Sequence, residues 1–165
     1  MARILIIAAS TGKNLDLALK FKQSLEEKGH EGVVTDLCAL NIPMYTPAAE
    51  KELTELTSIV GVMEHILSSD AMIVCAPEYN GSTPPVLSNL IAWLSVQSKN
   101  FRMLFNQRKV GLASVSGGGG QHAVMGMRMQ FSYLGSNVIG RPVIINKSNP
   151  FKQSSIDVLI QQVVQ

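Results

Sequence analysis

Short apolar runs alternate with longer amphipathic segments along the whole of this 165-residue chain. The continuous apolar runs at residues 4–9 and 71–76 are typical of strands buried in a parallel sheet. Between them, apolar residues recur at helical spacing, as in the segment 15–28, which Gly29 ends. This alternation predicts an α/β fold, with a parallel sheet that helices cover on both faces.

The same patterns divide the rest of the chain. We expect five strands, at residues 4–9, 33–37, 71–76, 109–115 and 137–145, the last of them interrupted by Pro142. We expect five helices, at residues 15–28, 50–67, 84–96, 121–134 and 154–164. The second helix is expected to face the core with Leu53, Leu56, Val60, Met63 and Leu67. Because of the length, and because no linker or repeat breaks the pattern, residues 1–165 are expected to form a single domain.

Composition narrows the class of protein. Hydrophobic residues make up 46% and charged residues 16% of the chain, which is typical of a globular protein. The net charge of +2 is too small and too scattered for a nucleic-acid-binding surface. No apolar stretch approaches the roughly 20 residues of a membrane span. Cys38 and Cys75 have neither metal-site nor disulfide spacing. We therefore expect a cytoplasmic protein with two buried thiols, and neither nucleic acid nor membrane as a partner.

The loop between the first strand and the first helix has the composition of a phosphate site. It reads Ser10, Thr11, Gly12, Lys13, Asn14. Hydroxyls, a glycine and free amide groups at a helix N-terminus suit a phosphate, helped by the helix dipole and by Lys13. The alternative is a simple capped turn. A P-loop is excluded because Ile7 stands where it needs a glycine, and the dinucleotide motif G-x-G-x-x-G is absent.

The loop after the third strand, residues 77–82, carries groups that suit a flat, polar-edged ring. Glu78, Tyr79 and Asn80 place a charge, an aromatic ring and an amide side by side, just before Gly81. The loop follows the carboxyl end of a strand, where open α/β sheets bind their ligands. A hairpin turn at Asn80 and Gly81 is rejected, because the residues that follow have a helical pattern.

The loop after the fourth strand is rich in glycine. Ser116 is followed by four glycines, clamped between a strand and a helix. Its backbone can lie close to a ligand, and its N–H groups can stabilise an anion. We expect a positive φ at Gly118, where a β-branched residue would fit poorly. The alternative is a flexible spacer.

Together these residues resemble the NADPH-dependent FMN reductase family, a branch of the flavodoxin-like fold. The resemblance rests on P-E-Y-N at 77–80, on Ser82 and Pro84, and on L-x-N-x-I-x-W-L-S at 87–95. It implies a doubly wound sheet with the strand order 2-1-3-4-5 and a bound FMN. The first loop is shorter than is usual in the family, and Lys13 is its only charge.

The resemblance also implies which residues hold the cofactor. The FMN phosphate would contact the first loop, at Ser10, Thr11, Gly12, Lys13 and Asn14. The isoalloxazine ring would contact the other two loops, at Pro77, Glu78, Tyr79, Asn80, Gly81, Ser82, Ser116, Gly117 and Gly118. No side chain is expected to act as a catalytic acid or base, since the flavin itself carries the chemistry.

The function that the resemblance implies is an FMN-dependent NAD(P)H oxidoreductase. It would pass a hydride from NAD(P)H to FMN and on to a quinone, a free flavin, an azo compound or a metal oxyanion. A homodimer or homotetramer is implied, and the Met125, Met127 and Met129 cluster is consistent with an interface or with core packing. One alternative is a flavodoxin-type electron carrier without NAD(P)H turnover, which the short first loop favours and the slightly basic charge opposes. The other is a flavin-binding protein with a regulatory role, or one that has lost its cofactor.

Overall fold

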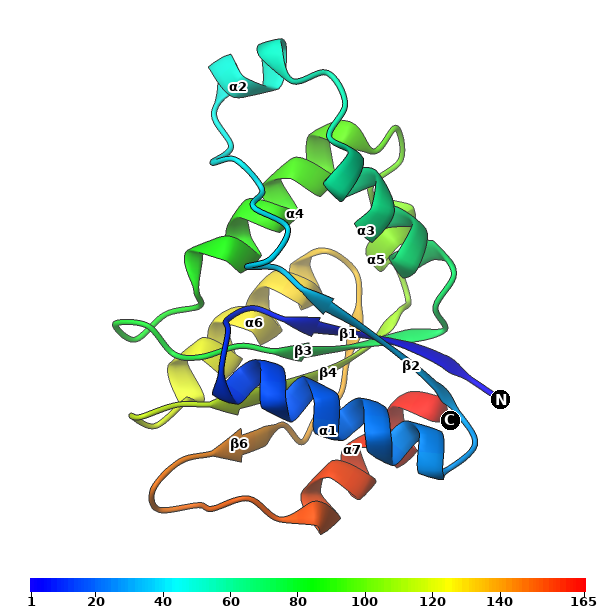
Figure 1. The fold of residues 1–165 in the computed structure, drawn as a ribbon, viewed down its shortest axis with the longest axis vertical. Coiled ribbons are helices and arrows are strands. Elements are labelled where there is room, and N and C mark those ends of the chain that lie inside the picture. Colours follow the sequence, from blue (N-terminus) through cyan, green and yellow to red (C-terminus); the bar gives the residue numbers. More distant parts are fainter.

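The computed structural model describes residues 1–165 and contains one parallel sheet between two layers of helices (Figure 1). The strands lie in the order β2 (Glu31–Asp36), β1 (Arg3–Ala8), β3 (Ala71–Cys75), β4 (Lys109–Val115) and β5 (Asn137–Val138). A sixth strand, β6 (Val143–Ile145), also pairs with β4, and every pairing is parallel. The order 2-1-3-4-5 and the α/β class are therefore confirmed.

The helices divide between the two faces of the sheet. On one face lie α1 (Lys13–Glu27) and α7 (Gln153–Val164), and on the other α3 (Thr57–Leu67), α4 (Pro85–Gln97), α5 (Arg102–Phe105) and α6 (Gln121–Tyr133). Side chains of a strand alternate between the faces, so Ile4 and Ile6 join a core of 16 buried residues under α1 and α7. Leu5 and Ile7 join the larger core of 23 residues on the other face.

The expected fifth strand is two strands. β5 pairs with the beginning of β4, and β6 pairs with its end. The four residues between them include Pro142, which lacks the N–H that a strand interior needs. Arg128 of α6 stabilises the break, because its Nη2 donates to the carbonyl oxygens of Ile139 and Gly140 at 2.9 and 3.0 Å.

The prediction of a single helix at 50–67 is also wrong, because this stretch forms two helices. A short α2 (Pro47–Glu52) without buried residues ends at Leu53, and α3 begins after Leu56. Gln97 of α4 stabilises the gap between them: its Nε2 donates to the Leu53 carbonyl, and its Oε1 accepts from the Leu56 N–H. The break shifts the helical phase, so Leu67, expected to face inward, is 55% exposed.

The core face of α3 consists of other residues than expected. Its buried residues are Ile59, Val62 and Ile66, whereas Leu53, Leu56, Val60 and Met63 are half-buried. The short helix α5 was not expected at all.

Segment 41–46 is irregular, and α4 holds it in place. Nε1 of Trp93, which is fully buried, donates to the Pro43 carbonyl at 2.7 Å. Asn89 accepts from the Tyr45 N–H at 2.8 Å and donates to the Pro43 carbonyl at 3.0 Å. Two residues of the family-like motif, Asn89 and Trp93, therefore have a structural role in this chain.

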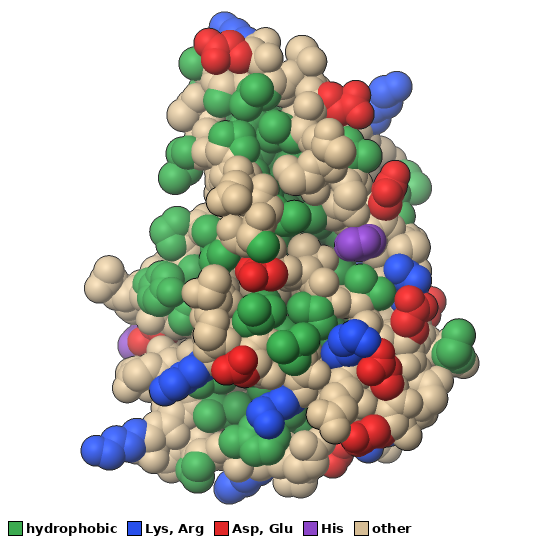
Figure 2. Space-filling view, viewed as in Figure 1, with side chains coloured by type: hydrophobic (Ala, Val, Ile, Leu, Met, Phe, Trp, Pro, Cys, Tyr) green, Lys and Arg blue, Asp and Glu red, His purple; other side chains and the backbone are tan.

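The surface carries both signs of charge. Figure 2 shows Lys and Arg side chains interspersed with Asp and Glu over one face, rather than gathered by sign. Neither cysteine is in a disulfide; Cys75 is buried, as expected, whereas Cys38 is only half-buried. None of the helices combines the length and apolarity that crossing a membrane requires.

Candidate functional site

The strand register brings three loops to one edge of the sheet. Ala8 of β1 pairs with Cys75 of β3, which pairs with Ala113 of β4. The ladder continues beyond the strands, since the Ala9 N–H donates to Cys75 and the Ala76 N–H to Ala113. The loops that follow β1, β3 and β4 therefore leave the sheet side by side.

The first loop ends in a helix N-terminus that no side chain caps. Gly12 is the N-cap of α1, with φ of 70°, and no side chain accepts from the first turn. Thr11 and Lys13 are exposed, and Ser10 is buried. Free N–H groups, a hydroxyl and an ammonium group at a helix N-terminus form a site that attracts anions.

Asn14 connects the first loop to the third. Its side chain is buried and bonded at both ends, with Nδ2 donating to the Val115 carbonyl and Oδ1 accepting from the Val115 N–H, each at 2.9 Å. The Asn14 amide is therefore already engaged, and only its backbone remains for a ligand. The bond fixes the start of α1 against the end of β4.

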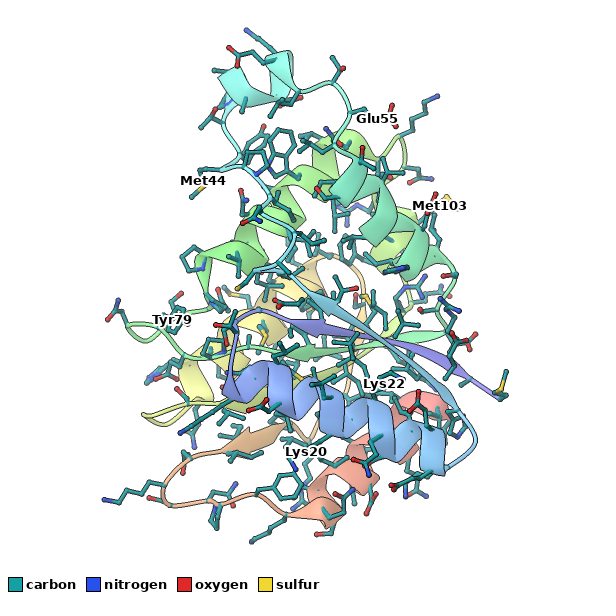
Figure 3. All side chains as sticks on the ribbon, viewed as in Figure 1. Lys20, Lys22, Met44, Glu55, Tyr79 and Met103 are labelled. Atoms are coloured by element: carbon teal, nitrogen blue, oxygen red, sulfur yellow. The ribbon has the colours of Figure 1, made fainter.

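The second loop contains the hairpin turn that the sequence analysis rejected. Tyr79 and Ser82 exchange two backbone hydrogen bonds of 3.0 Å in an antiparallel bridge. Between them Asn80 and Gly81 have φ of 50° and 72°, as in a type I′ turn. The expectation that no hairpin turn forms here was wrong. Such a turn needs only the four residues 79–82, so a helix can still begin soon afterwards, as α4 does at Pro85. Tyr79 extends from this turn (Figure 3) and is 49% exposed.

Glu78 caps α6 from a distant part of the chain. The N-cap position of α6 is Gly120, which has no side chain to accept from the first turn. Oε2 of Glu78 accepts instead from the backbone N–H of His122 at 2.9 Å and of Ala123 at 3.4 Å. Oε1 lies 3.5 Å from Nδ1 of His122. Glu78 thereby joins the second loop to the third.

The environment of Glu78 keeps its carboxyl group ionised. Its side chain is only 12% exposed. This partial burial favours the neutral acid, but the bonds from the backbone N–H groups of His122 and Ala123, and from the His122 ring, outweigh it. The pKa of Glu78 is therefore held below its ordinary value.

The third loop differs in conformation from the expectation. Gly118 does not have a positive φ; the positive φ of 76° occurs two residues later, at Gly120. A Cβ at Gly120 would also lie 3.1 Å from Ile144 and 3.2 Å from Ser114 Oγ. The restriction to glycine therefore applies at Gly120. A Cβ at Gly117 would meet nothing within 4 Å, so the backbone there borders open space.

Two hollows lie along these loops. One, of about 410 Å³, is lined by Lys13 and Gly117 and by a loop that the sequence analysis missed, with Lys147, Pro150 and Phe151. That loop follows β6, so its place at a strand carboxyl end was the signal that could have identified it. Ser116 also lines this hollow. Seven of the predicted residues line neither of the two hollows: Ser10, Thr11, Gly12, Asn14, Pro77, Gly81 and Gly118.

The second hollow, of about 550 Å³, follows the turn in the second loop. It is lined by Glu78, Tyr79, Asn80, Ser82, Thr83 and Pro85. One end of the site thus offers cations and a free helix terminus, and the other offers a polar turn beside a glycine loop. This arrangement suits an elongated ligand with an anionic end and a flat end.

The fold and this edge of the sheet define a flavodoxin-like protein. A model of the NADPH-dependent FMN reductase family matches residues 2–150, and the chain belongs to that family. An NADPH azoreductase of Bacillus sp. (strain OY1-2) is 25% identical over 118 residues. That alignment covers 70% of this chain but only 62% of the azoreductase.

Solved structures agree with the fold. The flavoenzyme NAD(P)H:(acceptor) oxidoreductase FerB from Paracoccus denitrificans superposes with a TM-score of 0.75 at 18% identity, over 99% of this chain and 94% of FerB. The azoreductase from Bacillus anthracis str. Sterne gives 0.67 at 17% identity, over 99% and 97% of the two chains. A flavodoxin from the domain Archaea gives 0.65 at 9% identity, over 99% and 94%.

The contacts of Glu78 lead to a prediction about pH and stability. Replacement Glu78→Gln should lower the melting temperature at pH 7, because the first turn of α6 loses its anionic acceptor. Since the folded pKa lies below the ordinary value of 4.5, this contribution is present above pH 4.5 and is lost as pH falls through the folded pKa. Thermal unfolding of both proteins between pH 7 and pH 3 should show the difference shrinking in acid.

The matched control is Glu55→Gln, which removes a charge from an exposed side chain with no hydrogen bond. Its melting temperature should follow that of the wild type. Equal melting temperatures of Glu78→Gln and wild type at pH 7 would contradict the capping role.

Proposed function

We propose that this protein is an FMN-dependent NAD(P)H oxidoreductase. The observation that carries the proposal is the convergence of three loops, with an uncapped helix N-terminus at one end and an open glycine backbone at the other. Membership of the NADPH-dependent FMN reductase family implies the same cofactor and co-substrate.

The residues present fit the phosphate end of FMN. The N-terminus of α1 has no side-chain cap, so its N–H groups are free to donate to a phosphate. Thr11 adds an exposed hydroxyl and Lys13 an exposed ammonium group. The side chain of Asn14 would not take part, because it is bonded to Val115.

The residues also fit the ring end. Gly117 presents bare backbone to open space, where a flat ring could lie close. A ring beside it would meet the turn at residues 79–82, whose positive φ values hold Asn80 and Gly81 at the loop tip. The carboxylate of Glu78 is engaged by α6, so its role would be to hold the second and third loops together.

FMN bound at this site would supply the redox chemistry, taking a hydride from NAD(P)H and passing the electrons to an acceptor. The part of this chain would be to position and to polarise. Backbone N–H groups of residues 117–119 would donate to ring atoms that gain negative charge, as preorganised dipoles do. No side-chain acid or base is needed there.

The acceptor would enter over the second loop. The hollow lined by Tyr79, Ser82 and Pro85 is open and has a volume of about 550 Å³, which suits a small planar molecule. Quinones, free flavins, azo compounds and metal oxyanions are the candidates, and the name of the Bacillus relative favours an azo compound among them.

A flavodoxin-type electron carrier is the second candidate. The short first loop favours it. The net charge of +2 opposes it, because electron carriers of this type are typically strongly acidic.

One anaerobic experiment separates these functions. The purified protein, loaded with FMN, is mixed with NADH or NADPH, and the flavin absorbance is followed in a stopped-flow instrument. We expect rapid bleaching, followed by recovery when a quinone or azo dye is added. A yellow protein that neither nucleotide bleaches would indicate the carrier, and a protein that binds no FMN would contradict the proposal.

The phosphate end is tested by Lys13→Ala. The substitution removes the charge of the first loop, and we expect FMN to bind roughly 3- to 10-fold more weakly, as for one exposed charge-assisted contact. The quenching of FMN fluorescence on binding measures the affinity. Lys51→Ala, a lysine of α2 at the far end of the molecule, is the control; equal weakening by both substitutions would contradict a specific role of Lys13.

We also propose that α6 forms the contact in a homodimer. Met125, Met129 and Tyr133 are spaced by four residues on one helix face and are 63, 74 and 78% exposed, whereas Met127 is buried. Met129→Lys should shift the sedimentation equilibrium toward the monomer. A wild type that is monomeric at every concentration would contradict the proposal.

A reducing, cytoplasmic location is consistent with the free thiols of Cys38 and Cys75. We infer that location on this ground, and fractionation of the source cells would test it. Recovery of the protein in an oxidising compartment would contradict it.

A further inference from the structure

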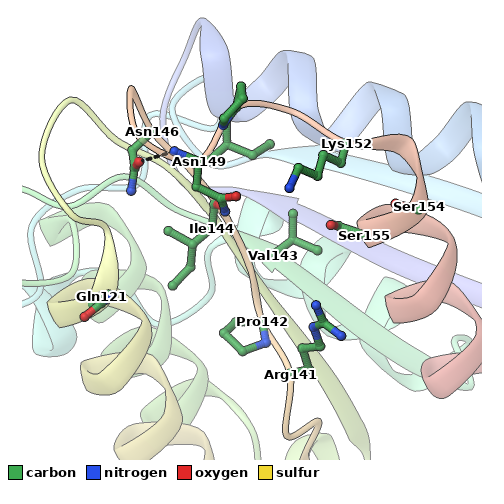
Figure 4. Close-up of a pocket in the computed structure, with 12 residues that line it drawn as sticks. Gln121, Arg141, Pro142, Val143, Ile144, Asn146, Asn149, Lys152, Ser154 and Ser155 are labelled. Carbon is green, nitrogen blue, oxygen red and sulfur yellow. Dashed lines mark hydrogen bonds between the residues drawn. The ribbon is translucent and has the colours of Figure 1, made fainter.

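Another polar hollow, of about 470 Å³, lies along the edge strand β6 (Figure 4). Its walls come from Gln121 at the start of α6, from the strand and the loops on either side of it, and from Lys152, Ser154 and Ser155 at the start of α7. It adjoins the hollow lined by Lys13 and Gly117, with which it shares Ile145, Asn146 and Pro150, but its charged groups are different ones. We propose that this hollow binds the phosphate group of a small molecule.

Two cationic side chains converge on the hollow, and no carboxylate lines it. In Figure 4 the Arg141 guanidinium and the Lys152 ammonium group point into it from opposite sides of Val143. Neither forms a salt bridge or a side-chain hydrogen bond within the chain. The hollow therefore holds two positive charges with no counter-charge from the protein.

Arg141 differs in this respect from every other arginine of the chain. Arg3 is paired with Glu31, Arg102 donates to the Tyr133 carbonyl, Arg108 to those of Ser69 and Leu104, and Arg128 to those of Ile139 and Gly140. A guanidinium matches the geometry of a phosphate with two parallel hydrogen bonds. The N–H groups of the Arg141 guanidinium have no partner in the chain, so they are free to donate to a phosphate.

The start of α7 places further donors at the same wall. Lys152 occupies the N-cap position without a side-chain cap, and the first turn contains no acidic residue. A cation there opposes the helix dipole, which favours an anion at this end. Asp157, farther along α7, is engaged by Lys28 at 3.0 Å and does not line the hollow. A bound anion would supply the negative charge that the N-terminus of α7 lacks and would offset the charge of Lys152.

The donor set favours a phosphate over a carboxylate. Besides the two cations, the hollow presents the hydroxyls of Ser154 and Ser155, of which Ser155 points inward in Figure 4. Three or more phosphate oxygens can accept from donors on several sides, whereas a carboxylate has two. The phosphate can belong to a free phosphorylated compound or to NADPH, and the chemistry of the hollow is the same for both.

The proposal is tested with inorganic phosphate. It is titrated into ¹⁵N-labelled protein at constant ionic strength, with FMN present at saturation so that the first loop is occupied. We expect saturable shifts of the backbone amide signals of residues 153–155. Arg141→Gln and Lys152→Gln should each weaken phosphate binding about tenfold. Lys99→Gln, which removes a charge from an exposed lysine elsewhere, should leave the affinity unchanged.

Two results would overturn the proposal: shifts confined to residues 10–14, or an affinity that Arg141→Gln and Lys152→Gln leave unchanged. If FMN does not bind, the titration is made on the flavin-free protein, so failure of the flavin site and failure of the phosphate site are separate results. In the flavin-loaded enzyme, the KM values of Arg141→Gln for NADPH and NADH identify which molecule carries the bound phosphate. An increase for NADPH but not for NADH indicates the phosphate of NADPH, and two unchanged values indicate a separate phosphorylated compound.

Discussion

The parallel register of β1, β3 and β4 is the constraint on which the candidate site depends. Ala8, Cys75 and Ala113 lie side by side across three strands, so three loops that are far apart in the chain begin at one edge of the sheet. Burial of the sheet on both faces keeps this register, because a slip of one residue would exchange the side chains of the two cores.

Two polar side chains, one buried and one half-buried, fix the positions of these loops relative to one another. Asn14 bonds both backbone groups of Val115 and joins the first loop to β4. Glu78 caps α6 and joins the second loop to the third. A site whose loops are held by such bonds before a ligand arrives loses less conformational freedom on binding. Asn14 and Glu78, which were expected to contact the ligand, thus bond other loops of the site with their side chains.

Much of the fold could be predicted from local pattern, because buried strands and amphipathic helices have their own sequence periods. The errors occur where distant residues decide. Gln97 stabilises the break before α3, and Arg128 the break between β5 and β6. The spacing of apolar residues within 50–67 contains no information about a hydrogen bond between Leu56 and Gln97, which lies 41 residues farther along the chain.

The candidate site was predictable as three loops but not in its internal contacts. Asn14 and Glu78 find their partners 101 and 44 residues away, beyond the reach of any motif. The turn at Asn80 and Gly81 could have been predicted from those two residues alone, because Asn-Gly favours a type I′ turn. It was not expected, because a helix follows it closely. The hollow at Arg141 and Lys152 combines a strand and a helix start that no single stretch of sequence connects.

The central claim is that the loops after β1, β3 and β4 together hold FMN. A crystal structure of the protein grown with a large excess of FMN tests it most directly. The account predicts the phosphate at the start of α1, beside Lys13, and the ring against the turn at residues 79–82 and the backbone of Gly117. Flavin density in another hollow, or none at this edge of the sheet, would contradict it.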